Sequence, residues 1–234
     1  MRILALETTA EACSVALLNN KNERFYFEQT SEKHAQRILP LIQKLLQHEQ
    51  ITLKQINAIA FSCGPGNFTG LRVGTSIAQG LALGSQIPLI GISTLNIMAE
   101  RAWRELGAQR VLVAMNARLG EIYWAEYQRN LHGSWLGKHT ESILDIETIL
   151  NRMTNLTEKW ICVGSEWIQR SELIKLSLIN LIKTTIVLPH AKDILPLALK
   201  ILSKGVHSKV EDVAPTYLRS TEIYNKMIRI PSLK

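Results

Sequence analysis

The order of predicted strands and helices repeats along this chain, and that repeat restricts the possible folds more than any other feature of the sequence. Short apolar runs bounded by polar residues predict strands in the first half at 2–6, 13–18, 23–28, 57–61 and 88–92. The apolar spacing typical of helices predicts helices at 34–47, within the glycine-rich stretch 61–84, and at 94–106. Three strands are therefore followed by alternating helices and strands.

The second half repeats this order. Strands are predicted at 111–115, 121–127, 160–164 and 185–188, with a weaker candidate at 134–136, and helices at 145–153, 166–178 and 191–203. Parallel strands need long crossover connections whereas antiparallel strands need only short turns, so each half is expected to form a mixed sheet with helices on its faces. We therefore predict a duplicated α/β fold with two lobes, 1–107 and 108–210. The tail, 211–234, is expected to return to the first lobe at a place that the sequence leaves open.

The stretch FSCGPGNFTGLRVGTSIAQGLALG, residues 61–84, predicts either a phosphate site or a close contact between backbones. Glycine-rich turns that lead from a strand into a helix expose N–H groups at a positive helix end. A P-loop is excluded, because Leu71 stands where its lysine should be. A dinucleotide fingerprint is nearly present, but Thr69 replaces its third glycine. The phosphate interpretation is therefore the weaker one.

The packing interpretation rests on small residues that recur at every fourth position, namely Gly70, Gly74, Ala78 and Ala82. Their stripe drifts by only about 40° per step around a helix. A glycine inside a helix costs about 0.8 to 1.0 kcal/mol relative to alanine, so its presence predicts the close approach of another backbone. That backbone belongs either to a partner or to the chain's own core.

Composition limits the class of protein rather than the fold. An apolar fraction of 46% with 20% charged residues is ordinary for a soluble globular chain, and the net charge of +7 favours proximity to an anionic partner such as nucleic acid. Cys13, Cys63 and Cys162 are widely spaced in apolar runs, which predicts buried thiols in a reducing cytosol. Glu7 and Glu11 interrupt the apolar N-terminus, so we expect a cytoplasmic protein without a signal peptide or a membrane span.

No spacing of histidines or cysteines predicts a metal site. His34 and His48 lie about 21 Å apart on one predicted helix, so they cannot share an ion and are expected to face solvent. Cys63 adjoins the glycine turn, but nothing in the sequence gives it a lowered pKa or a neighbouring base, which favours core packing over catalysis. No Ser-His-Asp or zinc signature of a protease is present.

Four segments carry a specific resemblance to a known family: LALETT, CGPGNFTGLRVGTSIAQGLA, MNARLGEIYWAEY and PTYLR. The duplicated layout resembles the actin, sugar kinase and Hsp70 (ASKHA) superfamily, whose two lobes close over ATP. Within it, the sequence resembles the TsaB (YeaZ) family across nearly the whole chain, most strongly over residues 1–100. The most specific motif includes Gly64, Pro65, Gly66, Phe68, Thr69 and Arg72.

The resemblance implies a non-catalytic subunit required for threonylcarbamoyladenosine (t6A) formation in tRNA. It implies a heterodimer with the catalytic paralogue TsaD, the help of the ATPase TsaE, and contact with tRNA through the complex. ATP or ADP and a divalent metal are then expected on the partner subunits, with no cofactor on this chain, which can also form a homodimer when alone. The family's pairing of N-terminal lobes places a partner interface at Gly70, Gly74, Ala78, Ala82, Ile38 and Ile42. Gly74→Leu or Ala78→Leu is then expected to leave the lone chain folded and to weaken partner binding.

The same resemblance marks a degenerate nucleotide site. Superfamily members that use ATP carry an Asp in the first hairpin turn, where this chain has Glu7, Thr8 and Thr9. The second turn has Asn116, which cannot ionise and so cannot act as a general base. These residues do not exclude a weak nucleotide site. They also do not exclude the alternative, an autonomous ATP-dependent small-molecule kinase or hydrolase. Arg72 lies in the first turn of its helix, where the dipole disfavours a cation, so we expect it to have an acidic or carbonyl partner.

Overall fold

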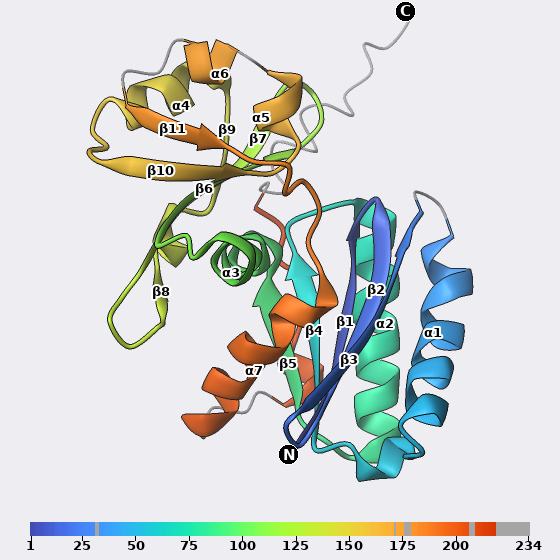
Figure 1. Cartoon of the computed structure of the whole chain (residues 1–234). Coiled ribbons are helices and arrows are strands. Elements are labelled where there is room, and N and C mark those ends of the chain that lie inside the picture. The colour runs from blue at the N-terminus through green and yellow to red at the C-terminus, as the bar shows by residue number, and fades with distance from the viewer. Residues whose placement is uncertain (31–32, 171, 176–178, 206–208, 219–234) are drawn as a thin grey trace, which may run out of the picture.

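The structure, a computed structural model, consists of two mixed sheets flanked by helices (Figure 1). It describes residues 1–30, 33–170, 172–175, 179–205 and 209–218. The first sheet has the order β3-β2-β1-β4-β5, formed by β1 (Arg2–Ala10), β2 (Ala12–Asn19), β3 (Asn22–Gln29), β4 (Ala58–Gly64) and β5 (Leu89–Ser93). The first three strands pair antiparallel, whereas β4 and β5 continue the sheet in parallel, as the two kinds of connection predict.

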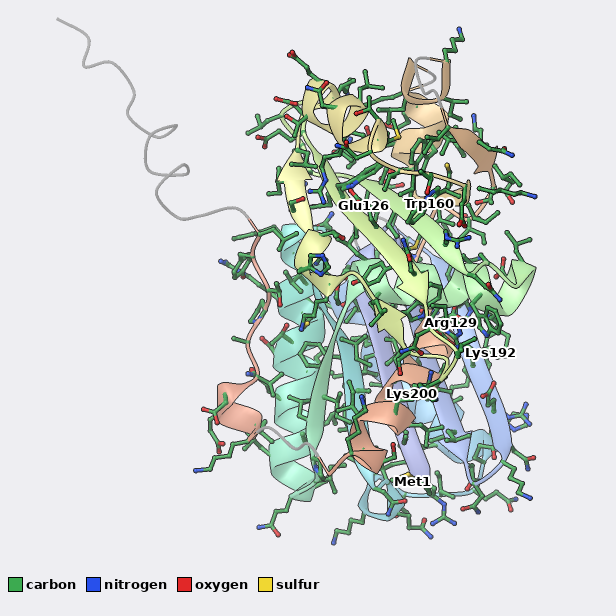
Figure 2. All side chains as sticks on the ribbon, turned by 90° about the vertical axis from the view of Figure 1, so that its left-hand side faces the viewer. Met1, Glu126, Arg129, Trp160, Lys192 and Lys200 are labelled. Atoms are coloured by element: carbon green, nitrogen blue, oxygen red, sulfur yellow. The ribbon has the colours of Figure 1, made fainter. Side chains whose placement is uncertain are left out.

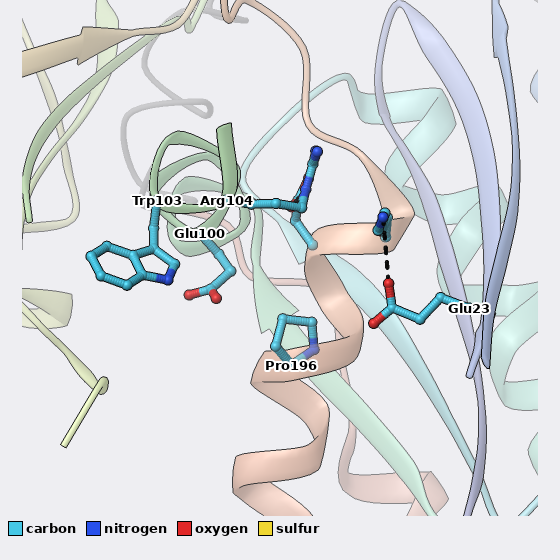
Figure 3. A pocket seen from close by; sticks show the side chains of 7 residues that line it. Glu23, Glu100, Trp103, Arg104 and Pro196 are labelled. Atoms are coloured by element: carbon cyan, nitrogen blue, oxygen red, sulfur yellow. Dashed lines mark hydrogen bonds and ion pairs between the residues drawn. The ribbon is translucent and has the colours of Figure 1, made fainter. Parts of the chain in front are cut away.

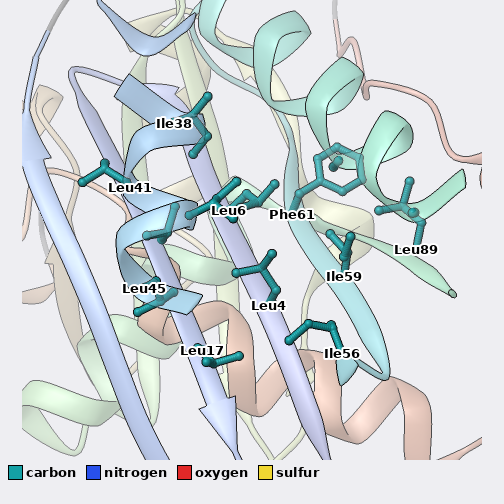
Figure 4. Close-up of a cluster of buried hydrophobic side chains, with 14 of the residues drawn as sticks. Leu4, Leu6, Leu17, Ile38, Leu41, Leu45, Ile56, Ile59, Phe61 and Leu89 are labelled. Carbon is teal, nitrogen blue, oxygen red and sulfur yellow. The ribbon is translucent and has the colours of Figure 1, made fainter. Parts of the chain in front are cut away.

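Helices α1 (His34–His48) and α2 (Phe68–Ser85) cover one face of this sheet. The inward side of α1 carries aliphatic residues that meet the apolar side chains of β1, β2 and β4 (Figure 4), among them Ile38, Leu41, Ile42 and Leu45. All of these side chains are nearly inaccessible to solvent. Their burial supplies most of the hydrophobic stabilisation of this face.

The second sheet has the order β11-β10-β6-β7-β8, with β9 also paired to β7. Its strands are β6 (Arg110–Asn116), β7 (Ile122–Arg129), β8 (Trp135–Leu136), β9 (Ser142–Leu144), β10 (Lys159–Val163) and β11 (Asn180–Lys183). One face packs on α4 (Ile146–Met153), α5 (Glu166–Gln169) and α6 (Glu172–Lys175) through a core that contains Trp124, Trp160 and Trp167. The other face meets α3 (Thr94–Leu106), which lies between the two sheets.

Three local predictions for the second half are wrong. The helix expected at 166–178 is divided, in its described part, into the one-turn helices α5 and α6. The strand expected at 185–188 lies earlier, at β11, where Asn180 to Lys183 pair with β10. A short 3-10 turn, Ala191–Asp193, precedes α7 (Ile194–Ser203) in place of a single helix over 191–203.

Helix α7 packs on the first sheet, although the repeat placed it in the second lobe. Its apolar residues Ile194, Leu195 and Ala198 join a buried cluster with Ile3 and Ala5 of β1. This face of the first sheet is lined by alanine and isoleucine and needs an apolar cover, which α1 and α2 cannot give because they occupy the opposite face. Helix α7 therefore packs with the first lobe, although the predicted boundary at residue 107 assigned it to the second.

Two further contacts connect distant parts of the chain. Gly133, in the turn between β7 and β8, accepts a hydrogen bond from Lys200 of α7, and Arg129 forms an ion pair with Glu100 of α3 at 2.6 Å (Figure 2). Residues 213–217 lie against the first lobe, where the backbone N–H of Thr216 donates to the carbonyl of Cys63. Ile223 and Met227 of the tail lie outside the described residues. No helix in the described ranges is long and apolar enough to cross a membrane.

Candidate functional site

Glu7 lies near the end of β1, next to the first hairpin turn, and is fully buried. Glu7 Oε1 accepts hydrogen bonds from the backbone N–H and the hydroxyl of Thr9, both at 2.6 Å. The other carboxyl oxygen, Oε2, is buried and has no hydrogen-bond partner in the described part of the chain. Burial raises the pKa of Glu7, against the opposing effect of the Thr9 bonds. The turn therefore favours a neutral acid, which is a poor ligand for a metal.

The motif from Gly64 to Arg72 lies directly on this turn. The N–H of Asn67 donates to the Thr9 carbonyl at 2.7 Å, and the Thr8 hydroxyl donates to the Gly70 carbonyl at 2.7 Å. A Cβ at Gly66 would overlap the Thr9 backbone, and one at Gly70 would overlap the Thr8 carbonyl. These glycines are needed because the start of α2 touches the backbone at the end of β1.

The start of α2 is capped from within the motif. The Asn67 side chain accepts from Thr69 N at 3.1 Å and from Gly70 N at 3.5 Å, as an N-cap residue does. Gly64 lies close to the tail, because a Cβ there would approach the Thr216 carbonyl to 2.8 Å, and Pro65 follows it through a cis peptide bond. This geometry supports backbone packing over phosphate binding as the reason for the glycine-rich sequence.

The predicted partner interface at the small-residue stripe is wrong. Ala78, Ala82, Ile38 and Ile42 are at most 4% exposed, and all four belong to the core of the first lobe. Gly70 and Gly74 are also buried, and a Cβ at Gly74 would overlap the Thr8 hydroxyl. The spacing correctly indicated a close contact, but the contacting backbone is the chain's own β1. Gly74→Leu and Ala78→Leu should therefore unfold the lone chain, contrary to the expectation from sequence.

The opposite surface of the same two helices is open, and we call it the outer face of α1 and α2. Leu39 of α1 is 49% exposed and Leu83 of α2 is 52% exposed. A Cβ added at Gly80 or Gly84 would meet no atom within 4 Å. The regular four-residue spacing in the sequence indicated only the buried stripe of small residues. The two glycines and the exposed leucines of the outer face follow no comparable spacing.

Among the described residues, Arg72 has a phenol and an aromatic ring as partners in place of the acidic or carbonyl group expected from its position. Its Nε donates to the hydroxyl of Tyr217 at 3.2 Å, and its guanidinium lies over the Phe68 ring at 3.6 Å from the ring centroid. Phe68 and Tyr217 are each about half exposed, and their rings are in contact. Arg72 thus connects the tail to the first turn of α2 through a cation–π contact and a phenol oxygen.

The second turn, after β6, is built around Asn116. Its Oδ1 accepts from Arg118 N at 2.8 Å, and its Nδ2 donates to Oε1 of the buried Glu166 at 3.1 Å. Glu166 in turn forms an ion pair with Arg170, one helical turn later. Gly164, which has a φ of +110°, passes so close to β6 that a Cβ would overlap the Ala114 carbonyl. The amide of Asn116 is therefore used to hold the turn.

The cysteines and histidines form no cluster. In the described ranges, no three His, Cys, Asp or Glu side chains are placed to hold a metal ion. Cys13 and Cys162 are buried as predicted, while Cys63 is only partly buried, and burial raises the pKa of all three thiols. His34 was expected to face solvent but is 3% exposed, with Nε2 at 2.9 Å from the Ala10 carbonyl oxygen.

A small cleft of about 180 Å³ lies between β3, α3 and α7 (Figure 3), lined by Glu23, Glu100, Trp103, Arg104, Lys192, Asp193 and Pro196. Most of its charges are paired within the chain. Arg104 donates to both carboxyl oxygens of the buried Asp193, at 2.5 and 3.0 Å, and Lys192 lies 3.5 Å from Glu23. These pairs indicate a structural role for the cleft.

Known proteins resemble this chain over both lobes. The model of the family described as "TsaD: tRNA N6-adenosine threonylcarbamoyltransferase" matches residues 25–226. The "tRNA threonylcarbamoyladenosine biosynthesis protein TsaB" of Escherichia coli (strain K12) is 47% identical over 97% of this chain and 98% of that protein. The protein of the same name from Haemophilus influenzae is 36% identical over 97% of each chain.

Solved structures extend this similarity to three dimensions. The structure described as "YeaZ from Pseudomonas aeruginosa" has a TM-score of 0.82 and 35% identity, and the match covers 93% of this chain and 99% of that chain. The similarity confirms the predicted α/β fold, in which two mixed sheets of like strand order are flanked by helices.

Proposed function

Because this chain belongs to the TsaB family, we propose that it takes part in t6A biosynthesis as a non-catalytic subunit. It acts with a TsaD-type paralogue as a heterodimer and with a TsaE-type ATPase. Together they transfer threonylcarbamoyl from threonylcarbamoyl-AMP to N6 of the adenosine next to the anticodon, in tRNAs that read codons beginning with A. ATP or ADP and the divalent metal bind to the partner subunits. This chain contacts tRNA through the complex, in the cytoplasm.

One observation supports the non-catalytic role: the polar side chains at both turns, Glu7 and Asn116, are hydrogen-bonded to other groups of the chain itself. Glu7 is fully buried, and that burial raises its pKa and disfavours the charged carboxylate that would hold a metal–nucleotide complex. In the second turn, Asn116 is bonded to Arg118 and Glu166 and has no ionisable group. Neither turn offers the general base or charged ligand that phosphoryl transfer needs.

The partner contact that we propose is the outer face of α1 and α2. Leu39 and Leu83 are large apolar side chains about half exposed to solvent. Gly80 lies in an exposed part of α2, where a glycine costs about 1 kcal/mol relative to alanine and where an added Cβ would meet no described atom within 4 Å beyond its own helix backbone. The approach of a second helix backbone would account for that cost.

Reconstitution tests the function directly. The purified chain is combined with the TsaD-type protein, the TsaE-type ATPase, threonylcarbamoyl-AMP and unmodified tRNA, and formation of t6A is measured with and without it. We expect modification to require this chain, Glu7→Gln to keep full activity, and the lone chain to show no substantial ATP turnover. ATP turnover by the lone chain that Glu7→Gln abolishes would instead identify an autonomous ATP-dependent enzyme.

A further inference from the structure

The positive charge of Arg72 has no counter-charge within the described part of the chain. Its side chain is exposed near the start of α2, and none of the ion pairs among the described residues includes it. Other arginines hold a carboxylate of this chain, as Arg37 holds Glu28. A cation near a helix start is also disfavoured by the helix dipole. The charge of Arg72 is therefore available to an acid outside the chain.

The guanidinium of Arg72 is held by two aromatic side chains. Its Cζ lies over the Phe68 ring, 3.6 Å from the ring centroid, and its Nε donates to the Tyr217 hydroxyl at 3.2 Å. An arginine also carries N–H donors on Nη1 and Nη2, and in the described ranges these have no acceptor. The two terminal nitrogens form the fork that binds a carboxylate through two parallel hydrogen bonds. The part of Arg72 that recognises acids is thus free.

Both supports of Arg72 are themselves fixed in place. Phe68 is the first residue of α2. Tyr217 is held through its neighbour Thr216, whose backbone N–H donates to the carbonyl of Cys63 at 2.6 Å. The two rings lie 6.5 Å apart between their centroids. The orientation of the fork is therefore set before any ligand binds, which reduces the conformational entropy lost on binding.

Arg72 lies on the same side of α2 as the outer face of α1 and α2. Leu83 is eleven residues further along the helix, which corresponds to about 20° around the axis and about 16 Å along it. Gly80 lies between them and is exposed. Phe68 and Tyr217, each about half exposed, add apolar area beside the charge. The outer face therefore continues to a single cation at the N-terminal end of α2.

We propose that Arg72 binds a carboxylate of the TsaD-type partner, from an aspartate or glutamate side chain at the edge of its contact with α2. Nη1 and Nη2 donate to the two carboxylate oxygens, while the rings of Phe68 and Tyr217 exclude water from the pair. This inference rests on the proposed function, because it gives the chemistry of the partner at one end of the outer face.

RNA phosphate is the other acid that an arginine fork can bind. Affinity for a phosphate backbone grows with the number of cations that contact it, which favours several cations along a groove. Here one fork lies beside two aromatic rings and continues into the leucine and glycine surface of α2. Aromatic residues and arginine are enriched where protein interfaces are buried, and they contribute most of the binding free energy there. A protein carboxylate therefore fits this surface better than a phosphate backbone.

Calorimetric titration of the full chain with the TsaD-type protein, without tRNA, tests the contact through a graded series at one position. Arg72→Lys keeps the charge but loses the fork, so we expect binding about threefold weaker. Arg72→Gln should weaken binding by about tenfold, and Arg72→Glu by about a hundredfold, because two carboxylates then repel. Arg72→Glu should stay folded, since an acid near a helix start is favourable. Added salt should weaken the unsubstituted complex and strengthen the Arg72→Glu complex.

Two matched variants separate binding of an acid from support of the tail. Arg110→Gln removes a partly exposed arginine of the second lobe that already pairs with Glu158, and it should leave the affinity unchanged. Tyr217→Phe removes only the hydrogen bond to Nε of Arg72 and should weaken binding less than Arg72→Gln. An equal loss in Tyr217→Phe and Arg72→Gln would show that Arg72 only holds the tail, and would overturn the proposal.

The remaining outcomes distinguish this inference from the proposed function. Equal affinity of the unsubstituted and Arg72→Gln chains, together with weaker binding by Gly80→Leu, would overturn the inference and leave the proposed contact intact. No binding by the unsubstituted chain would overturn both. Normal partner binding by Arg72→Gln with a loss of tRNA binding in a filter assay would assign the fork to phosphate and would also overturn the inference.

Discussion

The turns of the two lobes occupy equivalent places in the duplicated fold but are closed by different means. In the first lobe, Glu7 is buried beside Thr9, and the glycines at the start of α2 lie against Thr8 and Thr9. In the second lobe, Asn116 is held by Glu166, which forms an ion pair with Arg170. One turn therefore relies on close backbone contact and a buried acid without a cation, and the other on a charged pair.

This difference shows how equivalent turns of a duplicated fold can be stabilised in two ways. The first lobe keeps a carboxylic acid but surrounds it so closely that the charged form is disfavoured. The second lobe has an amide in place of the acid, and that amide is bonded to Glu166 and to the backbone of Arg118. The two regions should consequently respond differently to substitution and to pH.

The largest effects should come from the glycine contacts, which both lobes share. Gly70→Ala and Gly164→Ala each place a Cβ on a backbone carbonyl, of Thr8 and of Ala114. We expect each to lower the free energy of unfolding by about 3 kcal/mol or more, and the thermal midpoint by roughly 6 °C or more. Gly80→Ala is the matched control, and it should stabilise the chain by up to about 1 kcal/mol because its Cβ meets open space. Equal midpoints for Gly70→Ala and Gly80→Ala in calorimetry would refute the backbone contact.

A smaller effect should separate the second turn from the first. Arg170→Ala leaves the fully buried Glu166 carboxylate without its cation, which should cost about 2 kcal/mol in chemical denaturation. Arg118→Ala removes a nearby cation without removing that pair and should have little effect. If both substitutions cost the same, the ion pair does not hold the second turn.

The smallest effect concerns pH and belongs to the first lobe. Because burial raises the pKa of Glu7, the folded chain retains a proton that the unfolded chain loses above about pH 4.3. The stability that this group contributes is complete below that pH and is lost as the pH rises through the folded pKa, by up to about 1.4 kcal/mol per pH unit. Glu7→Gln should therefore match the unsubstituted chain at low pH and exceed it in free energy of unfolding at higher pH.

The control for this pH dependence is Glu11→Gln, which changes an exposed glutamate in the same turn. An equal change in the slope of stability against pH in both variants would show that the burial of Glu7 is not its cause. A Glu7→Gln chain that is less stable than the unsubstituted chain at neutral pH would show that Glu7 is charged in the fold.

The sequence predicted most of the first lobe, because its strands and helices alternate with clear apolar periods. The sequence did not predict which element packs against each buried helix face. The spacing of Gly70, Gly74 and Ala78 indicates a close contact whether a partner or β1 supplies it, and only the three-dimensional packing distinguishes the two. Similarly, the apolar pattern of α7 predicts a buried helix but not which sheet it covers.

Around the candidate site, residue types were easier to predict than contacts. The absence of an ionisable group at Asn116 follows from the sequence alone, whereas the closure of Glu7 depends on segments more than fifty residues apart. The tail was expected to return to the first lobe, but the bond between Tyr217 and Arg72 joins residues 145 positions apart in the sequence. The second half was predicted less well, since its short elements at 166–175 and 180–183 have too few residues for a clear period.

We propose that this chain acts through the outer face of α1 and α2, and calorimetric titration with the TsaD-type protein measures that contact. Gly80→Leu adds a side chain in open space on that face, and Asn151→Leu adds one on the exposed side of α4 in the second lobe. Both variants should remain folded, and Gly80→Leu alone should weaken binding by about tenfold or more, since overpacking typically costs about 1 to 3 kcal/mol. Unchanged affinity of folded Gly80→Leu, or an equal loss in Asn151→Leu, would contradict the claim.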